Sequence, residues 1–391
     1  MSTDAKTFLL TGGRAPCTLE LARLLYHAGH RVIVAESLRH HLCRFSRAVA
    51  RNVHVPPPRQ DPDGFLSSLA EIVNQEKVNV LIPTCEEVFT LARGSGRFPD
   101  HCRVWVEPIE RLTPLHNKWT FIQEAGELGL QTPMTWMAAS HSKLTEILRN
   151  INGKFPIILK PVYSRFAAEV YLLRHPAQPC PALSVSPEKP WIVQEWIDGR
   201  QICTYSLAFE GKLIAHCAYR TTFTAGKGSS ILFTPIEHPQ LLKHVEEWMA
   251  SKKYTGQFSF DWIETAEGKL YPIECNPRAT SGIHCFGESD RLDQAFARPE
   301  TASLILPQAG VQRMLSLAMW SYGLFSVRSF SQWRNWIKSL LAAQDVVFRW
   351  RDPLPFICQF LLLIYFWKQS RRHQISMLEA STYDIEWNGE Y

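Results

Sequence analysis

Apolar and polar positions along the first part of the chain follow the pattern of strands that alternate with helices. Residues 8–10 form a short apolar run that ends in a Gly-Gly turn, and apolar side chains then recur at helical spacing. Gly29 ends this helical pattern, and a second apolar run over residues 32–35 leads to Glu36. This order predicts a βαβ unit with parallel strands.

The pattern continues up to residue 112. A proline-rich loop, "PPPRQDPDG", precedes a helical segment, and "VNVLIPTCEEV" and "CRVWVEP" each contain a run typical of a buried strand. We therefore expect residues 1–112 to form a small doubly wound α/β domain of the Rossmann-like type.

From residue 113 onward the pattern is that of strands with helices on one side. A helical segment begins at Lys118, the strand "FPIIL" follows, and later strands end in a hairpin-like pair, "GQFSFDWIE" and "KLYPIECNPR". This predicts an α+β region over residues 113–305, with lobes of 113–190 and 191–305. Residues 306–391 have a helical, aromatic-rich pattern.

Composition and charge narrow the class of protein. The 391 residues exceed what one hydrophobic core serves, and 46% hydrophobic with 20% charged residues is typical of a folded chain. The net charge of +5 is spread along the sequence, which argues against a nucleic-acid-binding protein. Ten cysteines without a CxxC pair favour neither a zinc module nor a disulfide framework. The start "MSTDAKTFLL" runs directly into a strand, so a cytoplasmic location is the simplest expectation.

One C-terminal stretch, "PLPFICQFLLLIYFWKQSRRH", is unusually apolar. Its apolar part covers about 13 residues, fewer than the ~20 that cross a bilayer. It is either a buried helix of a C-terminal subdomain or a membrane-surface helix with Lys368, Arg371 and Arg372 facing headgroups. A peripheral membrane contact through residues 353–372 therefore stays open.

The "TGGR" turn after the first strand is a second feature with two interpretations. A strand, a glycine turn and a helix N-terminus can bind an anion, and Glu36 stands where a ribose would be held. However, "TGGRAPCTLE" departs from GxGxxG. We expect a Rossmann-like scaffold without a bound dinucleotide, and an NAD-dependent oxidoreductase is the weaker alternative.

Two lysines and an acidic cluster form the strongest candidate site. Lys118 opens a helix, where a cation is unfavourable unless an anion is also present, and Lys160 ends a strand. The alternation in "SFDWI" places Asp261 opposite the aromatic side chains, and in "ECNPR" Glu274 and Asn276 point the same way. Two carboxylates and an amide oxygen are hard ligands that suit Mg²⁺.

These residues, in this order, resemble the ATP-grasp superfamily over residues 1–305. The string E-x-N-P-R resembles that of carbamoyl-phosphate synthase large subunits and is similar to E-x-N-x-R of biotin carboxylase. The resemblance implies a Rossmann-like pre-ATP-grasp domain followed by a two-lobed ATP-grasp domain. It implies that Lys118 and Lys160 hold the α- and β-phosphates of ATP, and that Arg278 stabilises the transferring phosphoryl group.

The resemblance also implies roles for the rest of the motif. The hinge that reads adenine corresponds to Gln194, Glu195 and Ile197, and Gln201 stands where the family usually has a ribose-binding carboxylate. The metal ligands, for Mg²⁺ or Mn²⁺, correspond to Asp261, Glu274 and Asn276. The loop "TTFTAGKGSS", flanked by Arg220 and Lys227, is either a lid over the γ-phosphate or acceptor, or an ordinary basic loop.

The phosphate loop departs from the family. ATP-grasp proteins usually carry a glycine-rich loop after the phosphate lysine, whereas here the segment is "PVYSRFAAEV". We expect Ser164 and Arg165 to replace backbone contacts with side-chain contacts to phosphate. The alternative is a weakened loop with slow or absent turnover.

The resemblance thus implies an ATP- and Mg²⁺-dependent ligase. It would activate a small-molecule carboxylate as an acyl phosphate for attack by an amine or other nucleophile. The alternatives are an ATP-binding regulatory protein or a catalytically weakened one. The sequence names neither substrate and leaves a homodimer open.

Overall fold

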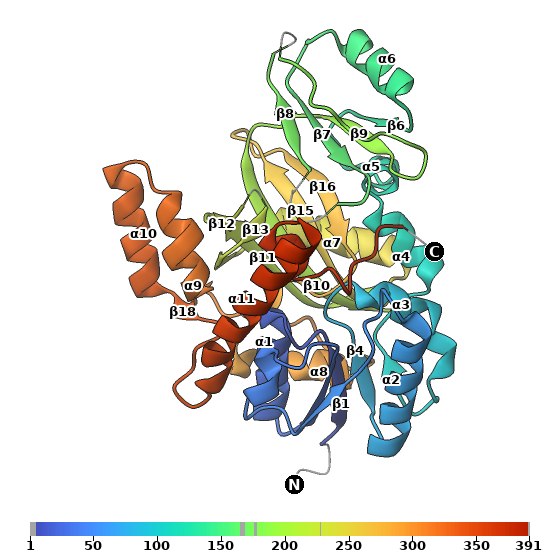
Figure 1. Cartoon of the computed structure of the whole chain (residues 1–391), viewed down its shortest axis with the longest axis vertical. Helices are drawn as coiled ribbons and strands as arrows, with labels where there is room; N and C mark the ends of the chain where they lie inside the picture. The colour runs from blue at the N-terminus through green and yellow to red at the C-terminus, as the bar shows by residue number, and fades with distance from the viewer. Residues whose placement is uncertain (1–4, 165–168, 176–177, 227, 390–391) are drawn as a thin grey trace.

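The computed structural model describes residues 5–164, 169–175, 178–226 and 228–389. Three sheets are stacked along the long axis of the molecule, with the N-terminal sheet at one end and a small lobe at the other (Figure 1). A large antiparallel sheet lies between them, and C-terminal helices cover one side of it (Figure 1).

The N-terminal sheet is parallel, with strand order β3-β2-β1-β4-β5. Its strands are β1 (Thr7–Thr11), β2 (Arg31–Glu36), β3 (Arg51–His54), β4 (Val80–Ile82) and β5 (Arg103–Val104). The helices of this part are α1 (Pro16–His27), α2 (Pro62–Glu76) and α3 (Glu87–Arg93), with 3-10 turns η1 (Leu42–Phe45) and η2 (Ser95–Arg97). This confirms the predicted doubly wound α/β arrangement.

The sequence pattern missed one strand of this sheet. β3 has the sequence RNVH, which is polar and only partly buried, so it contains no apolar run. It pairs in parallel with β2 at one edge of the sheet. At this edge the strand is less completely covered than the central strands, so its side chains need not be apolar. This explains why the sequence shows no apolar run here.

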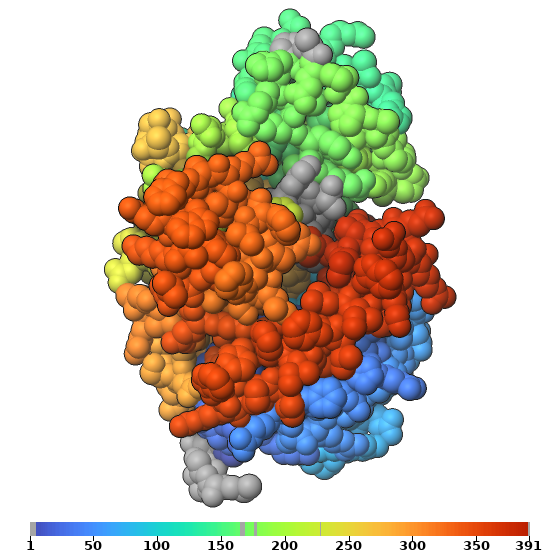
Figure 2. All heavy atoms as spheres, turned by 60° about the vertical axis from the view of Figure 1, so that its left-hand side comes forward, coloured from blue at the N-terminus to red at the C-terminus, as the bar shows by residue number. Residues whose placement is uncertain are grey.

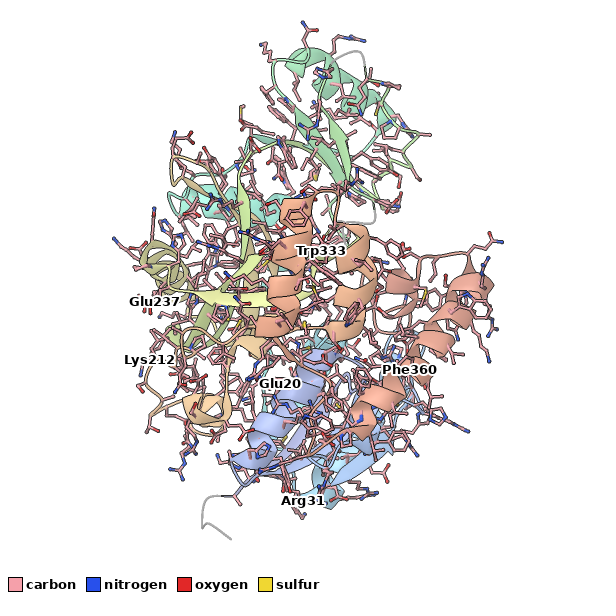
Figure 3. The ribbon with its side chains drawn as sticks, turned by 90° about the vertical axis from the view of Figure 1, so that its left-hand side faces the viewer. Glu20, Arg31, Lys212, Glu237, Trp333 and Phe360 are labelled. Carbon is pink, nitrogen blue, oxygen red and sulfur yellow. The ribbon has the colours of Figure 1, made fainter. Side chains whose placement is uncertain are left out.

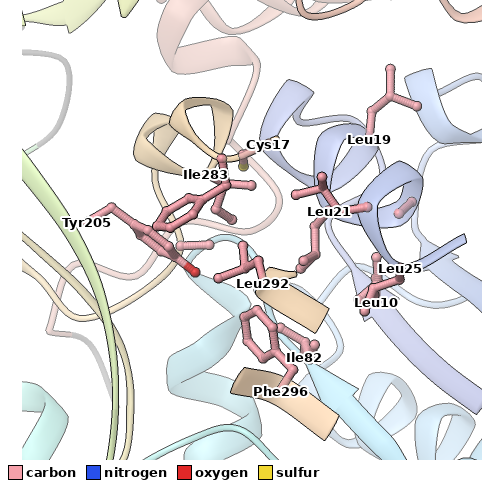
Figure 4. Packing of buried hydrophobic residues seen from close by; sticks show 14 of the residues in the cluster. Leu10, Cys17, Leu19, Leu21, Leu25, Ile82, Tyr205, Ile283, Leu292 and Phe296 are labelled. Carbon is pink, nitrogen blue, oxygen red and sulfur yellow. The ribbon is translucent and has the colours of Figure 1, made fainter. Parts of the chain in front are cut away.

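The central strands are apolar because helices cover both faces of the sheet. Phe8 and Leu10 of β1 belong to the cluster that includes α1, whereas Leu9 between them packs with α2. The first cluster continues to the large sheet, where Tyr205 of the sheet and Ile283 of a 3-10 turn beside it join the cluster (Figure 4). The N-terminal domain and the large sheet therefore share one core.

The small lobe is an antiparallel sheet with order β6-β9-β7-β8. Two helices lead into it, α4 (Ile109–His116) and α5 (Lys118–Glu127). The lobe consists of β6 (Thr135–Ala138), α6 (His141–Ile151), β7 (Ile157–Pro161), β8 (Tyr171–Leu173) and β9 (Trp191–Glu195). Because β9 joins β6 to β7, this sheet extends past residue 190, where the sequence pattern placed the lobe boundary.

The large sheet has order β16-β15-β10-β11-β14-β17-β18. Its elements are β10 (Arg200–Phe209), β11 (Lys212–Thr221), β14 (Leu232–Ile236), α7 (Pro239–Lys252), β15 (Gly256–Glu264) and β16 (Leu270–Asn276). A small ribbon and three short helical elements accompany it: β12 (Thr224–Ala225), β13 (Ser229–Ser230), η3 (Ser281–Cys285), η4 (Glu288–Asp290) and α8 (Leu292–Ala297). The predicted hairpin is β15–β16, and its aromatic residues 258, 260 and 262 pack against Trp248 of α7, as their alternation indicated.

The C-terminal region is mostly helical and joined to the large sheet by two short strands. It contains β17 (Arg313–Met314), α9 (Ser316–Ala318), the π-helical turn η5 (Met319–Gly323), α10 (Phe330–Ala342), β18 (Gln344–Asp345), α11 (Leu354–His373) and α12 (Met377–Ala380). Helix α11 packs on η1 of the N-terminal domain and on α12. Its Pro355, Cys358 and Leu362 are buried while most of its other apolar side chains are exposed, so it is not a fully buried helix. Within the described residues, no helix has the length and apolar character needed to cross a membrane.

Candidate active site

A cavity of about 370 Å³ lies between the small lobe and the large sheet. Residues from both sides line it, and they include almost every candidate from the sequence: Lys118, Lys160, Ser164, Gln194, Glu195, Ile197, Gln201, Asp261, Glu274, Asn276 and Arg278. The two lysines and the acidic hairpin are thus brought together although they are up to 160 positions apart in the chain, from Lys118 to Arg278.

Lys118 is held at the first turn of α5 by a capped helix start. The Asn117 side chain accepts hydrogen bonds from the backbone N–H groups of Trp119 and Thr120, which fixes where the helix begins. The buried Lys118 Nζ donates to the Ser164 carbonyl at 3.0 Å and lies 3.5 Å from Glu274 Oε2. This ammonium is therefore directed into the cavity rather than to solvent.

Lys160 ends β7 and is also buried. Its Nζ donates to the Ile273 carbonyl of β16 at 3.3 Å. Burial, helped by the charge of Lys118, lowers the pKa of Lys160 to about 8, although Glu274 and Asp261 oppose the shift. Two ammonium groups in one cavity would be stabilised by an anion placed between them.

The two carboxylates stand opposite each other on the β15–β16 hairpin, where Asp261 pairs with Glu274 in the register. Burial, together with the neighbouring Glu274, raises the pKa of Asp261 to about 7. For Glu274, burial acts in the same direction, but Lys118 and Lys160 outweigh it and lower its pKa. The charged form of Asp261 is thus the disfavoured one of the pair, and a divalent cation would stabilise both carboxylates in their charged form.

The donor set around this pair fits a magnesium ion. Asn276 follows Glu274 by two positions on β16, and its Oδ1 accepts a hydrogen bond from Arg278 Nη2 at 3.1 Å. The part of the chain that the structure describes holds no cluster of three or more His, Cys, Asp or Glu side chains suited to a metal. Two carboxylates and an amide match a cation that takes its other oxygens from water and phosphate.

Arg278 connects the cavity to the N-terminal domain. Its Nη1 donates to the Ala279 carbonyl at 3.1 Å, and its Nη2 lies 3.5 Å from Glu86 Oε1. Glu86 Oε2 in turn accepts a hydrogen bond from the backbone N–H of Trp387 at 3.2 Å. Sequence analysis did not assign Glu86 to the site, although its position just after the buried strand β4 is where ligands gather in α/β sheets.

The C-terminal segment packs beside the site through Trp387, which contacts Glu86. Its ring stacks on Phe89 at 4.4 Å and meets the Tyr163 ring edge-on at 5.4 Å. Tyr163 Oη accepts a hydrogen bond from Asn117 Nδ2 at 3.2 Å, next to Lys118. This contact set has no counterpart in the sequence motifs and was not predicted.

The segment predicted as the adenine hinge lies at the end of β9. Gln194 Nε2 donates to Thr135 Oγ1 at 2.9 Å, and the Glu195 N–H donates to the Met134 carbonyl at 2.8 Å. Apolar side chains that sequence analysis did not list form the nearby walls: Ile158, Val170, Ile263 and Ile273. Such apolar walls suit a flat aromatic ring. Their alternation with polar residues along the strands is the sequence pattern from which they could have been predicted.

One predicted residue, Arg220, lies away from this arrangement. Arg220 is exposed at the end of β11 and does not line the cavity, whereas its neighbour Tyr219 does. Successive side chains on a strand point to opposite faces, so the two cannot share this cavity. Arg165 and Lys227 lie outside the described residues.

The glycine turn of the N-terminal domain is filled by protein groups. The buried Glu36 carboxylate accepts hydrogen bonds from the Arg14 guanidinium and from the Arg14 backbone N–H at 2.9 Å. A Cβ at Gly12 would meet Thr84 Oγ1 at 2.6 Å, so this glycine allows close packing. The carboxylate that a dinucleotide ribose needs is therefore engaged by Arg14.

Comparison with known proteins agrees with this geometry. The family model described as "RimK-like ATP-grasp domain" matches residues 115–212. The arginine-specific large chain of carbamoyl phosphate synthase from Eremothecium gossypii is 28% identical over 193 residues, which cover 44% of this chain but only 17% of that protein. The match to this relative thus spans less than a fifth of its length.

Solved structures resemble the fold over a larger part of the chain. L-amino acid ligase from Bacillus licheniformis superposes with a TM-score of 0.56 and 13% identity, covering 76% of this chain and 75% of that one. The biotin carboxylase domain dimer of 2-oxoglutarate carboxylase from Hydrogenobacter thermophilus, in complex with MgADP, ADP and bicarbonate, gives 0.58 and 11%, covering 79% and 73%. At such identities the likeness concerns the fold.

Proposed function

Because this chain has the ATP-grasp fold, we propose that it is an ATP- and Mg²⁺-dependent ligase that activates a small-molecule carboxylate. The carboxylate oxygen attacks the γ-phosphorus, the bond to the β-γ bridging oxygen breaks, and ADP leaves. The resulting acyl phosphate is then attacked by an amine or another nucleophile, which releases phosphate. The observation that carries this proposal is the convergence of Lys118 and Lys160 with the Asp261–Glu274 pair in one cavity.

The nucleotide would lie between the lobes with its phosphates at the lysines. Both ammonium groups are largely withdrawn from water, so their attraction for phosphate oxygens is screened less than at a surface. The apolar walls would take the adenine, and Gln201 would reach the ribose. Gln201 Nε2 lies 3.5 Å from Asp261 Oδ2, so the ribose and metal positions would be neighbours.

Asp261, Glu274 and Asn276 would hold Mg²⁺, which neutralises phosphate charge and orients the γ-phosphoryl group when bound. Arg278 would stabilise the charge that develops on the transferring phosphoryl group, because its guanidinium borders the same cavity. Its contact with Glu86 keeps this cation directed at the cavity rather than at solvent.

An ATP-binding protein without ligase turnover is the second candidate, favoured by the glycine-free segment "PVYSRFAAEV". In this segment the Ser164 carbonyl accepts a hydrogen bond from Lys118 Nζ, so one of the donors of this lysine is already engaged within the protein. The two candidates differ in one measurable property, which is ADP release in the presence of acid and amine substrates.

The test is a calorimetric titration of ATP with and without Mg²⁺, beside NAD⁺, on three proteins. These are the wild type, Glu274→Gln, and Glu267→Gln as the matched control on the exposed turn of the same hairpin. We expect Mg²⁺-dependent ATP binding that Glu274→Gln weakens by at least about tenfold. Equal binding by both variants, or binding of NAD⁺ instead of ATP, would contradict the proposed site.

A screen of carboxylic acid and amine pairs for ADP release then separates the two candidates. Substrate-dependent release that disappears in Glu274→Gln and persists in Glu267→Gln supports the ligase. ATP binding without release for any pair favours the regulatory protein.

A further inference from the structure

The C-terminal region exposes an apolar surface that the ligase proposal does not use. We define the C-terminal apolar face as the exposed apolar side chains of α11 together with those of η5, α10 and Trp350. Several of them are largely open to solvent, with Phe330 77% and Trp350 87% exposed, and Phe325, just after η5, is 84% exposed and extends the face. Figure 2 shows the atoms of α10 and α11 side by side over one side of the molecule.

Helix α11 lies flat against the protein body and keeps one side open. Its Pro355, Cys358 and Leu362 are buried, and Cys358 Sγ donates to the His41 carbonyl of the N-terminal domain at 3.4 Å. On the outer side of the helix, Ile357 and Ile364 are 60% and 52% exposed. The two sets each recur at helical spacing, so the helix has a packed side and an apolar open side.

Aromatic side chains extend this open side beyond α11. Trp333 on α10 and Phe360 on α11 are both about half exposed, and Figure 3 views the side of the molecule that carries them. Trp367 near the end of α11 is also exposed, with the Arg371 guanidinium 5.9 Å from its ring centroid. Exposed tryptophans beside arginines are typical of proteins that sit at the boundary between lipid tails and headgroups.

The segment that carries this face, residues 313–373, is positively charged. Residues 313–373 contain nine Lys and Arg against two Asp, whereas the whole chain has a net charge of +5, so the rest of the chain is net negative. Both acids are engaged within the protein, because Asp352 pairs with Arg23 and Asp345 accepts from Ser316. Seven of the basic residues are exposed: Arg328, Arg334, Lys338, Arg351, Lys368, Arg371 and Arg372.

We propose that the C-terminal apolar face docks on the surface of a membrane that contains anionic lipids. The open side of α11 enters the boundary between headgroups and acyl chains, and the basic residues contact lipid phosphates. The charge decides between this occupant and a second copy of the chain. A symmetric dimer through this face would bring the two basic regions against each other, which is unfavourable, whereas an anionic bilayer complements them.

The test is flotation of the full chain with vesicles of phosphatidylcholine, alone or mixed with phosphatidylglycerol. The variant Ile357→Ser/Phe360→Ser/Ile364→Ser removes apolar area only from the open side of α11. Lys368→Glu/Arg372→Glu reverses charge at the end of the same helix. Tyr26→Ser/Leu128→Ser is the matched control, because it removes exposed apolar side chains that belong to α1 and to the end of α5.

We expect the wild type and the control to float with the anionic vesicles only, and less at high salt. Each α11 variant should lose at least about tenfold in vesicle affinity while its circular dichroism stays unchanged. The proposal is overturned if the wild type does not float, or if the α11 variants float as well as the control. It is also overturned if the wild type is a dimer that the triple variant dissociates while vesicle binding is unaffected, since a second copy would then cover this face.

Discussion

Lys118 Nζ lies 3.5 Å from Glu274 Oε2, which joins the first turn of α5 to the acidic hairpin of the large sheet. The lysine side chain is buried, whereas the glutamate is partly open to the cavity. The ammonium groups of Lys118 and Lys160 stabilise the charge of Glu274, and Asp261 lies opposite Glu274 on the neighbouring strand. The cavity therefore already contains both signs of charge that a metal–phosphate ligand would contact.

Replacing Asp261 by Asn should separate stability from ligand binding. The Asp261 charge is buried beside Glu274, so its removal relieves repulsion and should raise the free energy of unfolding by roughly 1–3 kcal/mol. The same change removes a proposed metal ligand and should abolish the Mg²⁺ dependence of ATP binding. Chemical denaturation and calorimetry measure the two effects, and a variant that is less stable than the wild type would refute the repulsion argument.

Gln201→Glu should not simply restore the carboxylate that the family usually has. A third carboxylate would stand close to Asp261, since Gln201 Nε2 is 3.5 Å from Asp261 Oδ2. We expect the variant to be less stable without Mg²⁺ and to gain more thermal stability than the wild type when Mg²⁺ and ATP are added. Thermal denaturation with and without both ligands measures this, and an equal gain in both proteins would contradict it.

Glu86→Gln should affect turnover more than nucleotide binding. The glutamate lies 3.5 Å from Arg278 and accepts from the Trp387 N–H, so the neutral variant keeps the shape but releases the guanidinium. We expect kcat to fall about tenfold with the KM for ATP little changed. Glu107→Gln, another buried glutamate of the N-terminal part, is the control and should leave kcat unaltered. A rise in KM with constant kcat would place Glu86 in nucleotide binding instead.

His216 should make the protein sensitive to acid. Burial lowers the pKa of His216 from 6.5 to about 3, so the folded chain keeps the ring neutral while the unfolded chain protonates it. Between about pH 3 and pH 6.5 the unfolded chain therefore binds one more proton, at His216, than the folded chain. The free energy of unfolding then falls as the pH drops below 6.5, by up to about 1.4 kcal/mol per pH unit.

The measurement is the free energy of unfolding at pH 7 and pH 5 for the wild type and His216→Gln. The glutamine can keep a hydrogen bond to Ser206, whose Oγ is 2.9 Å from His216 Nδ1. The variant should lose less stability between the two pH values than the wild type. Equal losses would show that His216 is not the group responsible.

Local patterns predicted much of the fold and of the site. The alternation of residues 258, 260 and 262 fixed which face of β15 packs on α7, and therefore where Asp261 points. The same rule separates Arg220 from the site only once the structure shows that its neighbour Tyr219 lines the cavity. The contact of Trp387 with Glu86 could not be found this way, since a contact between residues 301 positions apart leaves no local pattern.

The contacts of Asp384 and Trp387 with the N-terminal domain also determine when parts of this protein can complete their folding during synthesis. Arg14 is made 370 residues before the Asp384 that binds its guanidinium, and Glu86 is made 301 residues before Trp387. At ribosomal speeds of about 5–20 residues per second, Arg14 waits roughly 20–70 s for its partner. A nascent chain can thus form its first sheet early. The contacts that join Arg278 through Glu86 to Trp387 form only after residue 387 has left the ribosome. Fragments that end earlier therefore lack these contacts beside the cavity, even when they contain every motif residue.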